Sequence, residues 1–204
     1  MHVAVLGASG KGGSEIVREL VARGHTVTGI ARSPDKIPQM EGVTAKAGDA
    51  SNPAELAAHL GGVDAVISAV HFNISCDTLL TAIRQAGVKR LLIMGGAASL
   101  LGADGVMLYD SPTFPENVKP MVKPAIDFLE QLRGETEIDW TFFSPAMVIF
   151  EGERKGPGSF RLGGDELVTD GDGNSRISYA DYAIAMVDEL EQHQHSRARF
   201  TAAY

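Results

Sequence analysis

Short apolar runs alternate with amphipathic stretches over the first part of the chain. Residues 2–6 form an apolar run bounded by glycine, which is typical of a strand buried on both faces. A helical stripe of apolar residues over 16–21 follows a glycine-rich turn and ends at Gly24. Residues 25–31 predict a second strand. The chain therefore opens as strand, turn, helix and strand.

The same alternation continues toward the carboxy-terminal third. Further strands are predicted at 43–46, 63–70, 89–94 and 139–143, and helices at 53–60, 75–86 and 118–133. Strands that alternate with helices indicate a parallel sheet with right-handed crossovers. The periodicity fails between Gly96 and Asn117, and we interpret this long connection as an active-site loop.

The pattern changes after Pro145. Residues 157–178 are short, glycine-punctuated and alternating, as in a hairpin, whereas 179–191 predict a helix and 197–203 a last strand. No repeat or linker-like tract divides the chain. We therefore expect one α/β domain of 204 residues, a doubly wound parallel sheet in which residues 150–204 form a small α+β cap on the substrate side.

Composition limits the partners. The chain is 44% hydrophobic and 22% charged, which indicates a globular protein with one buried core. Its net charge is −8 and no long basic run is present, so we expect no nucleic-acid partner. The single cysteine, Cys76, excludes an internal disulfide and a thiolate-rich metal site. Because no signal peptide or membrane-length apolar stretch is present either, we expect a cytoplasmic protein without a membrane partner.

Residues 7–13 read Gly-Ala-Ser-Gly-Lys-Gly-Gly and separate the first strand from the first helix. In a doubly wound sheet this turn presents backbone amides and a helix N-terminus to a phosphate. Gly7 suits the tight turn, Gly10 lets the backbone approach a pyrophosphate, and Gly13 permits close helix packing. The spacing predicts a dinucleotide site, and a tight turn without a ligand is the alternative.

Arg32 follows the second predicted strand. An NAD-selective site usually has an acidic side chain here, which binds the adenosine ribose. A guanidinium group instead suits a 2′-phosphate. The sequence thus favours NADP(H) over NAD(H), with Asp35 nearby as the feature that keeps NAD(H) open and a solvated arginine as the alternative.

Several motifs accompany the glycine loop. They are 31–34 (Ala-Arg-Ser-Pro), 48–49 (Gly-Asp), 66–69 (Val-Ile-Ser-Ala), 139–146 (Asp-Trp-Thr-Phe-Phe-Ser-Pro-Ala), 161–165 (Arg-Leu-Gly-Gly-Asp) and 176–178 (Arg-Ile-Ser). With these motifs nearly the whole chain resembles an atypical short-chain dehydrogenase/reductase. It is more closely similar to the small NAD(P)H-binding proteins labelled NADH-flavin reductases, which are related to the NmrA-like and biliverdin-reductase-B-like groups. The resemblance implies a Rossmann fold.

The resemblance also implies contacts along the cofactor. The pyrophosphate would lie on the glycine loop, at Gly7, Ser9, Gly10, Lys11, Gly12 and Gly13. The adenosine phosphate would meet Arg32 and Ser33, with Asp49 and Ala50 beside adenine. The ribose on the nicotinamide side would meet Ala69 and Val70, and the nicotinamide would meet Gly95, Pro145, Ala146 and Met147.

The catalytic pair of typical short-chain dehydrogenases is missing, because no tyrosine is followed by a lysine four residues later. Lys119 and Lys123 stand where that pair would be, and Lys123 is either a ribose ligand or a solvated lysine. His71 follows the fourth strand, at the edge where open sheets bind ligands. We predict a catalytic or substrate-contacting role for His71, and a histidine hydrogen-bonded within its loop is the alternative. The apolar wall of the site is predicted from Phe72, Met94, Tyr109 and Phe114.

Direct hydride transfer to a stacked planar acceptor needs no tyrosine acid, since the proton can come from water. The sequence therefore predicts an NADPH-dependent oxidoreductase that reduces a flavin, quinone or similar planar small molecule, with flavin as a substrate rather than a bound group. One alternative is a redox-sensing regulator of the NmrA-like type that binds NADP(H) without turnover. Another is a reductase or epimerase that acts on a small carbonyl compound or a sugar nucleotide. No metal site is predicted, and the sequence makes no prediction of the oligomeric state.

Overall fold

The amino-terminal half alternates strands and helices, as the hydrophobic pattern predicts. The computed structural model describes residues 1–204. This half contains β1 (His2–Leu6), α1 (Lys11–Ala22), β2 (Thr26–Ala31), a 3-10 turn η1 (Pro34–Lys36), β3 (Val43–Ala47), α2 (Pro53–His59), β4 (Ala65–Ser68), α3 (Cys76–Gln85) and β5 (Arg90–Met94). Each predicted strand and helix of this half is confirmed, with small shifts at the boundaries.

The carboxy-terminal half also contains five strands, three of which have only three residues each. Its elements are a 3-10 turn η2 (Leu108–Asp110), α4 (Lys119–Arg133), β6 (Asp139–Ser144), β7 (Val148–Phe150), β8 (Arg161–Gly163), β9 (Arg176–Ser178), α5 (Tyr179–Gln192) and β10 (Ala198–Ala203). The predicted helices over 118–133 and 179–191 and the predicted last strand are confirmed. None of the helices in the structure is both long enough and apolar enough to cross a membrane.

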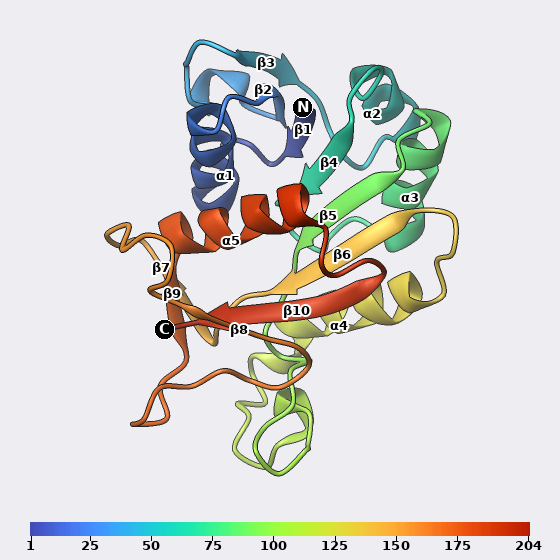
Figure 1. The fold of residues 1–204 in the computed structure, drawn as a ribbon. Helices are drawn as coiled ribbons and strands as arrows, with labels where there is room; N and C mark the ends of the chain where they lie inside the picture. Colours follow the sequence, from blue (N-terminus) through green and yellow to red (C-terminus); the bar gives the residue numbers. More distant parts are fainter.

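Eight strands form one sheet in the order β3-β2-β1-β4-β5-β6-β10-β8 (Figure 1). All neighbouring pairs are parallel except β10 and β8, which are antiparallel. The chain runs outward from β1 to β3 and then crosses back to β4, so the direction of winding reverses between β1 and β4. This is the doubly wound Rossmann arrangement, in which ligands bind beyond the carboxyl ends of the strands at the point of reversal.

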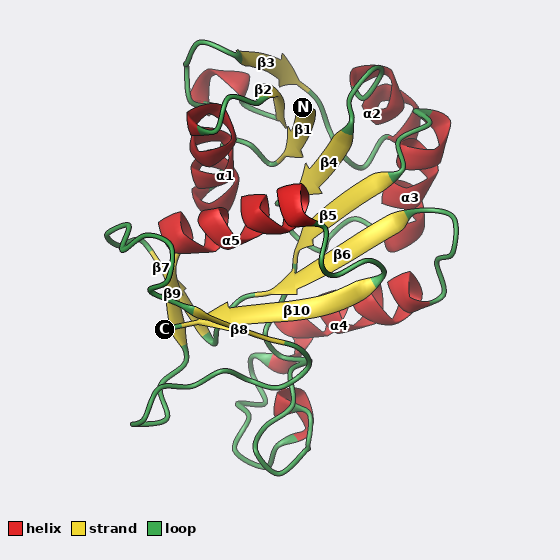
Figure 2. Ribbon diagram, viewed as in Figure 1, coloured by secondary structure: helices red, strands yellow, loops and turns green.

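Helices cover both faces of the sheet (Figure 2). On one face α1 and α5 pack together over one buried apolar cluster, which includes Ile16 and Met186. On the other face α2, α3 and α4 cover a second cluster, which includes Leu79 and Phe128. Successive strand residues alternate between the clusters, as Phe142 and Phe143 do. Burial on both faces is the physical reason why these strands read as short continuous apolar runs.

The hairpin predicted over residues 157–178 is wrong. β8 pairs with β10 in the main sheet, and β9 pairs in parallel with β7 in a separate two-stranded sheet. Both partners lie outside the predicted hairpin, and local alternation carries no information about a distant partner. Within the segment predicted as a cap, β10 joins the main sheet beside β6, α5 packs on α1, and β9 pairs with β7, which lies mostly before the segment.

The predicted irregular connection over residues 96–117 is confirmed. It contains η2 and two isolated bridges of Leu101, one to Met107 and one to Glu166. In Figure 1 this segment projects from the end of the sheet below α4. Its role as an active-site loop stays a prediction.

Candidate functional site

A cleft of about 490 Å³ opens at the carboxyl edge of the sheet, where the winding reverses. Its walls are the ends of β1, β2 and β4 and the loop after β3. Of the predicted site residues, the cleft brings together Gly7, Ser9, Gly10, Arg32, Ser33, Asp49, Ala50, Ala69, Val70 and His71. These residues come from four separate stretches of the chain, so the fold rather than the sequence alone brings them into one site.

The turn between β1 and α1 requires glycine at two positions. Gly7 has a φ of +74°, and a Cβ there would lie 2.7 Å from the carbonyl oxygen of Ala69. A Cβ on Gly13 would clash with the carbonyl oxygen of Gly7. The turn is fastened to the sheet because the amide of Gly7 donates to the carbonyl of Ile30 at 2.9 Å. Gly7 thus makes the tight turn, and Gly13 lets α1 pack closely on it.

The start of α1 is suited to an anion. Gly10 is its N-cap and provides no side-chain hydrogen bond, and the first turn contains no acidic residue. The free amides and the positive end of the helix dipole are therefore not neutralised from within the helix. Gly12 packs this turn against the end of β5, since a Cβ there would lie 2.5 Å from the sulfur of Met94. The cradle has room for backbone and a phosphate group rather than for side chains.

One end of the cleft carries two cations. Arg32 directly follows β2 and is exposed, and Lys36 in η1 lines the same end. Asp49 faces them from the loop after β3, and its Oδ1 accepts a hydrogen bond from the amide of Ser51 at 2.9 Å. That hydrogen bond, and to a lesser degree the charge of Arg32, lower the pKa of Asp49. Asp35 does not line the cleft.

Lys36 was not among the predicted site residues. The available signal was a second basic residue four positions after Arg32, in a turn that begins at Pro34. Sequence reasoning also missed Ser51, Asn73 and Ile74, which line the cleft from the loops after β3 and β4. Side chains in loops follow no periodic pattern, so their direction depends on how each loop folds back over the sheet.

The opposite end of the cleft holds His71. Its side chain is exposed and makes no hydrogen bond to the protein, so the alternative of a histidine hydrogen-bonded within its loop is not what the structure contains. Phe72 lies beneath it and packs edge-on against Phe128 with ring centres 5.1 Å apart. The imidazole of His71 is therefore available to a ligand, whereas Phe72 belongs to the core below.

The residues predicted beside the nicotinamide lie at the same edge but outside the cleft. Gly95 follows β5, donates its amide to the carbonyl of Phe143 at 2.8 Å, and has no room for a Cβ because the Phe142 ring lies against it. Pro145 and Ala146 after β6 are buried, and Met147 is 57% exposed. In the strand order β5 is next to β4 and β6 is next to β5, so these residues lie on the His71 side of the cleft.

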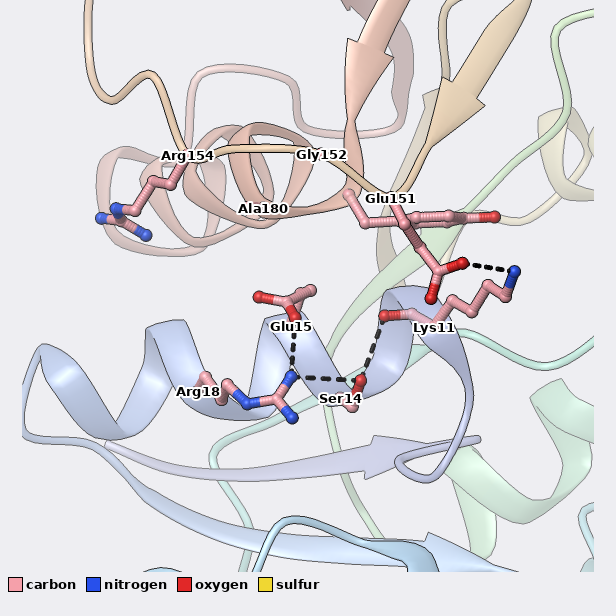
Figure 3. Close-up of a pocket in the computed structure, with 9 residues that line it drawn as sticks. Lys11, Ser14, Glu15, Arg18, Glu151, Gly152, Arg154 and Ala180 are labelled. Carbon is pink, nitrogen blue, oxygen red and sulfur yellow. Dashed lines mark hydrogen bonds and ion pairs between the residues drawn. The ribbon is translucent and has the colours of Figure 1, made fainter.

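Two predicted lysines point elsewhere. Lys11 is the first residue of α1, and its Nζ lies 2.7 Å from Oε2 of Glu151, in a second hollow of about 440 Å³ between α1 and the chain after β7 (Figure 3). That hydrogen bond raises the pKa of Lys11. Lys123 is exposed on α4, and its hydrogen bond to Asp127, one turn along the same helix, raises its pKa. The structure thus brings neither ammonium group into the cleft.

The remaining predicted wall residues form two groups. Met94 packs against the start of α1, whereas Tyr109 and Phe114 lie together in the 96–117 connection with ring centres 5.9 Å apart. The Nζ of Lys119 lies 5.3 Å from the centre of the Tyr109 ring. Only Met94 therefore touches the elements that form the cleft.

The arrangement suits an elongated polyanion better than a covalent reaction. The cleft offers backbone amides at its centre, two cations at one end and one free imidazole at the other. The single thiol, Cys76, is buried at the start of α3, and burial raises its pKa to about 12. A thiolate nucleophile is therefore absent from this site.

Comparison with known proteins agrees with this geometry. A family model described as NAD(P)H-binding matches residues 7–191. The protein YwnB of Bacillus subtilis is 36% identical over 98% of this chain and 97% of its own length. A structure from Bacteroides thetaiotaomicron, provisionally assigned as an epimerase, is 42% identical and covers 100% of this chain and 96% of its own, with a TM-score of 0.93. Another from Streptococcus pneumoniae, provisionally assigned as an NADH-flavin reductase, is 38% identical and covers 100% of this chain and 99% of its own, with a TM-score of 0.83. The chain therefore belongs to the NAD(P)H-binding family.

Proposed function

We propose that the protein is an NADPH-dependent oxidoreductase that passes hydride directly from the nicotinamide to a flavin, a quinone or a similar planar acceptor. The observation that carries the proposal is the division of the cleft, with two cations at one end and an open end beside His71 that offers no tyrosine acid. Family membership supports the cofactor, and the similarity to a provisionally assigned NADH-flavin reductase supports the class of acceptor.

The glycine loop would hold the pyrophosphate. The free amides at the start of α1 can donate hydrogen bonds to a phosphate group. The absence of Cβ atoms at Gly7 and Gly10 would let the backbone approach that group closely. Ala69 and Val70 would then lie along the ribose on the nicotinamide side. Together these contacts orient the cofactor along the edge of the sheet.

Arg32 and Lys36 favour a cofactor with a 2′-phosphate. A guanidinium group can donate two parallel hydrogen bonds to phosphate, and the ammonium group of Lys36 adds a second positive charge. The hydroxyl of Ser33 lines the same wall, whereas Asp49 and Ala50 would flank the adenine. Two cations against one carboxylate give this end a net attraction for a dianion.

Direct hydride transfer requires few catalytic groups from the protein. The reduced nicotinamide, when bound, supplies the hydride. The chain's own task is to hold the acceptor stacked against it, and a proton for the reduced acceptor can come from water or from His71. His71 is exposed and lines the cleft at the end where the acceptor would lie, which supports this role.

A second candidate is a reductase or epimerase that acts on a small carbonyl compound or a sugar nucleotide. The similarity to a provisionally assigned epimerase favours it. The missing Tyr-x-x-x-Lys pair disfavours this candidate. Lys123 is paired with Asp127, and the residue four positions before Lys123 is a lysine rather than a tyrosine. A regulator that binds NADP(H) without turnover would need the same cleft but no acceptor.

One experiment separates these functions. Purified protein is mixed with NADPH and, in turn, FMN, FAD, a quinone, a small aldehyde and a sugar nucleotide, and the loss of reduced-nicotinamide absorbance is followed. We expect oxidation that depends on FMN, FAD or the quinone. Tight NADPH binding without oxidation would favour the regulator, and turnover only with the aldehyde or the sugar nucleotide would favour the second candidate.

His71→Asn is a useful variant in this assay, because it keeps a polar side chain but removes the titratable imidazole. If His71 contacts the acceptor, the variant should raise the KM for the acceptor and leave the Kd for NADPH unchanged. The same protein must therefore also be titrated with NADPH alone. We expect the acceptor to be a small molecule and the reaction to take place in the cytoplasm.

A further inference from the structure

The segment that follows β7 is firmly attached at one end. We call residues 151–156 the strap. Arg154 of the strap forms an ion pair with Glu19 of α1, whose side chain is only 3% exposed. The amides of Lys155 and Gly156 donate to the buried carboxylate of Asp181 at 3.1 and 2.9 Å. Buried carboxylates with several donors are costly to expose, so this end of the strap stays in position.

The other end of the strap has a single polar attachment. Glu151 contacts Lys11 at 2.7 Å, and neither side chain has another hydrogen-bond or ion-pair partner. Their side chains are 70% and 63% exposed, respectively. Figure 3 shows Glu151 extending from the strap to the ammonium group of Lys11 at the start of α1. An exposed pair of two flexible side chains is weak and can separate at little cost.

The Lys11–Glu151 pair lies in the second hollow, at the start of the helix whose preceding glycine loop would hold the cofactor's pyrophosphate. Lys11 directly follows Gly10, which lines the cleft, and α1 has no acidic residue of its own in the first turn. The strap thus brings a carboxylate from a distant part of the chain to a helix start that otherwise lacks one. A carboxylate and a phosphate at one helix N-terminus compete for the same positive charge.

We propose that Glu151 lowers the affinity for the dinucleotide by competing with its pyrophosphate for Lys11. The inference rests on the proposed function insofar as the pyrophosphate lies on the glycine loop. The long stem of Lys11 can turn the ammonium group from Glu151 toward the phosphate, while the anchored end of the strap keeps the carboxylate nearby. Glu151 is therefore a positioning residue that acts through Lys11.

The test is Glu151→Gln, which removes the charge and keeps the size. We expect the variant to bind NADPH about two- to five-fold more tightly, as is reasonable for one exposed ion pair. The gain should shrink at high salt, because exposed charges are screened. It should appear in the KM for NADPH rather than in kcat. Glu151→Asp, which restores the charge, should return the affinity toward that of the wild type.

Matched controls make the result specific. Glu153→Gln removes a charge from the same strap, at an exposed residue without an ion pair, and should leave the affinity unchanged. Binding of 2′-AMP, which lacks the 5′-phosphates, should be the same in Glu151→Gln and in the wild type. Lys11→Met should weaken NADPH binding, and in that background Glu151→Gln should produce a smaller gain.

Each outcome decides something. Tighter binding by Glu151→Gln that depends on Lys11 and is absent for 2′-AMP supports the competition. Unchanged or weaker NADPH binding by Glu151→Gln overturns it, and so does a Lys11→Met variant that binds like the wild type. Failure of the wild type to bind NADPH at all would instead overturn the proposed function.

Discussion

The glycine loop (residues 7–13) and the 145–178 segment meet at the same edge of the sheet but are held in different ways. In the loop, Gly13 packs on Gly7 and the Gly7 amide bonds to the neighbouring strand. In the 145–178 segment the backbone bonds reach remote partners, as when the Leu167 amide donates to the carbonyl of Leu101 at 2.9 Å. The shape of the loop depends on residue types at close spacing, whereas the shape of the segment depends on what the rest of the chain brings to it.

The strongest test of this difference compares two glycines. Gly13→Ala should lower the free energy of unfolding by about 3 kcal/mol, because the new Cβ meets the Gly7 carbonyl and the backbone cannot move aside. Gly171→Ala in the 145–178 segment should change it by less than about 0.5 kcal/mol, since nothing lies within 4 Å of the new Cβ. Urea unfolding of both variants is the measurement. Equal losses of unfolding free energy in the two variants would mean that the glycine loop is no more tightly packed than the 145–178 segment.

The remote anchoring of the strap can be broken at Asp181. Asp181→Ala leaves the amides of Lys155 and Gly156 and the hydroxyl of Tyr204 without their buried acceptor, and should cost about 2 kcal/mol. Limited proteolysis within the strap should become faster. Asp172→Ala, which changes an exposed aspartate in the 145–178 segment, serves as the control. An unchanged cleavage rate in Asp181→Ala would show that Asp181 does not hold the strap.

NADPH binding in the cleft can be weakened without a change in the free energy of unfolding. Arg32→Ala should raise the Kd for NADPH by about ten-fold, which corresponds to about 1.4 kcal/mol, because a 2′-phosphate loses a bidentate partner. The Kd for NADH and the free energy of unfolding should stay the same, since Arg32 is exposed and forms no ion pair. Calorimetric titration checks this, with the exposed Arg133→Ala on α4 as a matched control. If Arg32→Ala also raised the Kd for NADH by about ten-fold, Arg32 would contact a part of the cofactor that NADH and NADPH share.

The smallest effect concerns Glu19, which joins the two regions through Arg154. Burial favours its protonated form, but hydrogen bonds from Arg154 and Arg23 outweigh burial and lower the pKa of Glu19 below its usual value. A lowered folded-state pKa contributes stability above about pH 4.5, and that contribution is lost as the pH falls through the folded-state value. Glu19→Gln should therefore be about 1 kcal/mol less stable than the wild type at pH 7 and approach it in acid.

Urea unfolding at several pH values measures this dependence. Glu15→Gln, on the same helix but in a surface pair with Arg18, should have little effect at any pH. A deficit of Glu19→Gln that does not change between pH 7 and pH 3 would contradict the role of the carboxylate charge.

Sequence reasoning succeeded where structure depends on nearby residues. The strands and helices through β6 follow from hydrophobic period, and the conformation at Gly7 follows from glycine spacing. It failed for β8, whose partner β10 lies far along the chain and cannot be found from local alternation. In the site, Arg32 was found because it ends a predictable strand, whereas Lys36 lies in a loop whose course depends on the fold.

Lys11 illustrates the same limit for a predicted ligand. The sequence predicts Lys11 in the turn before the first helix, whereas α1 begins at Lys11, and its partner Glu151 comes from the strap and could not be foreseen. A motif predicts the backbone position of a residue. The direction of its side chain depends on the charged groups that the tertiary structure brings near. The proposed competition at Lys11 follows from that difference.

The central claim is that this cleft uses NADPH to reduce a planar acceptor. The most direct measurement is kcat/KM for NADPH and for NADH with FMN as acceptor, under identical conditions. The account predicts acceptor-dependent oxidation with a kcat/KM for NADPH at least about ten-fold higher than for NADH, the difference expected from one well-bound phosphate. Equal values, a preference for NADH, or no oxidation that depends on FMN, FAD or a quinone would contradict it.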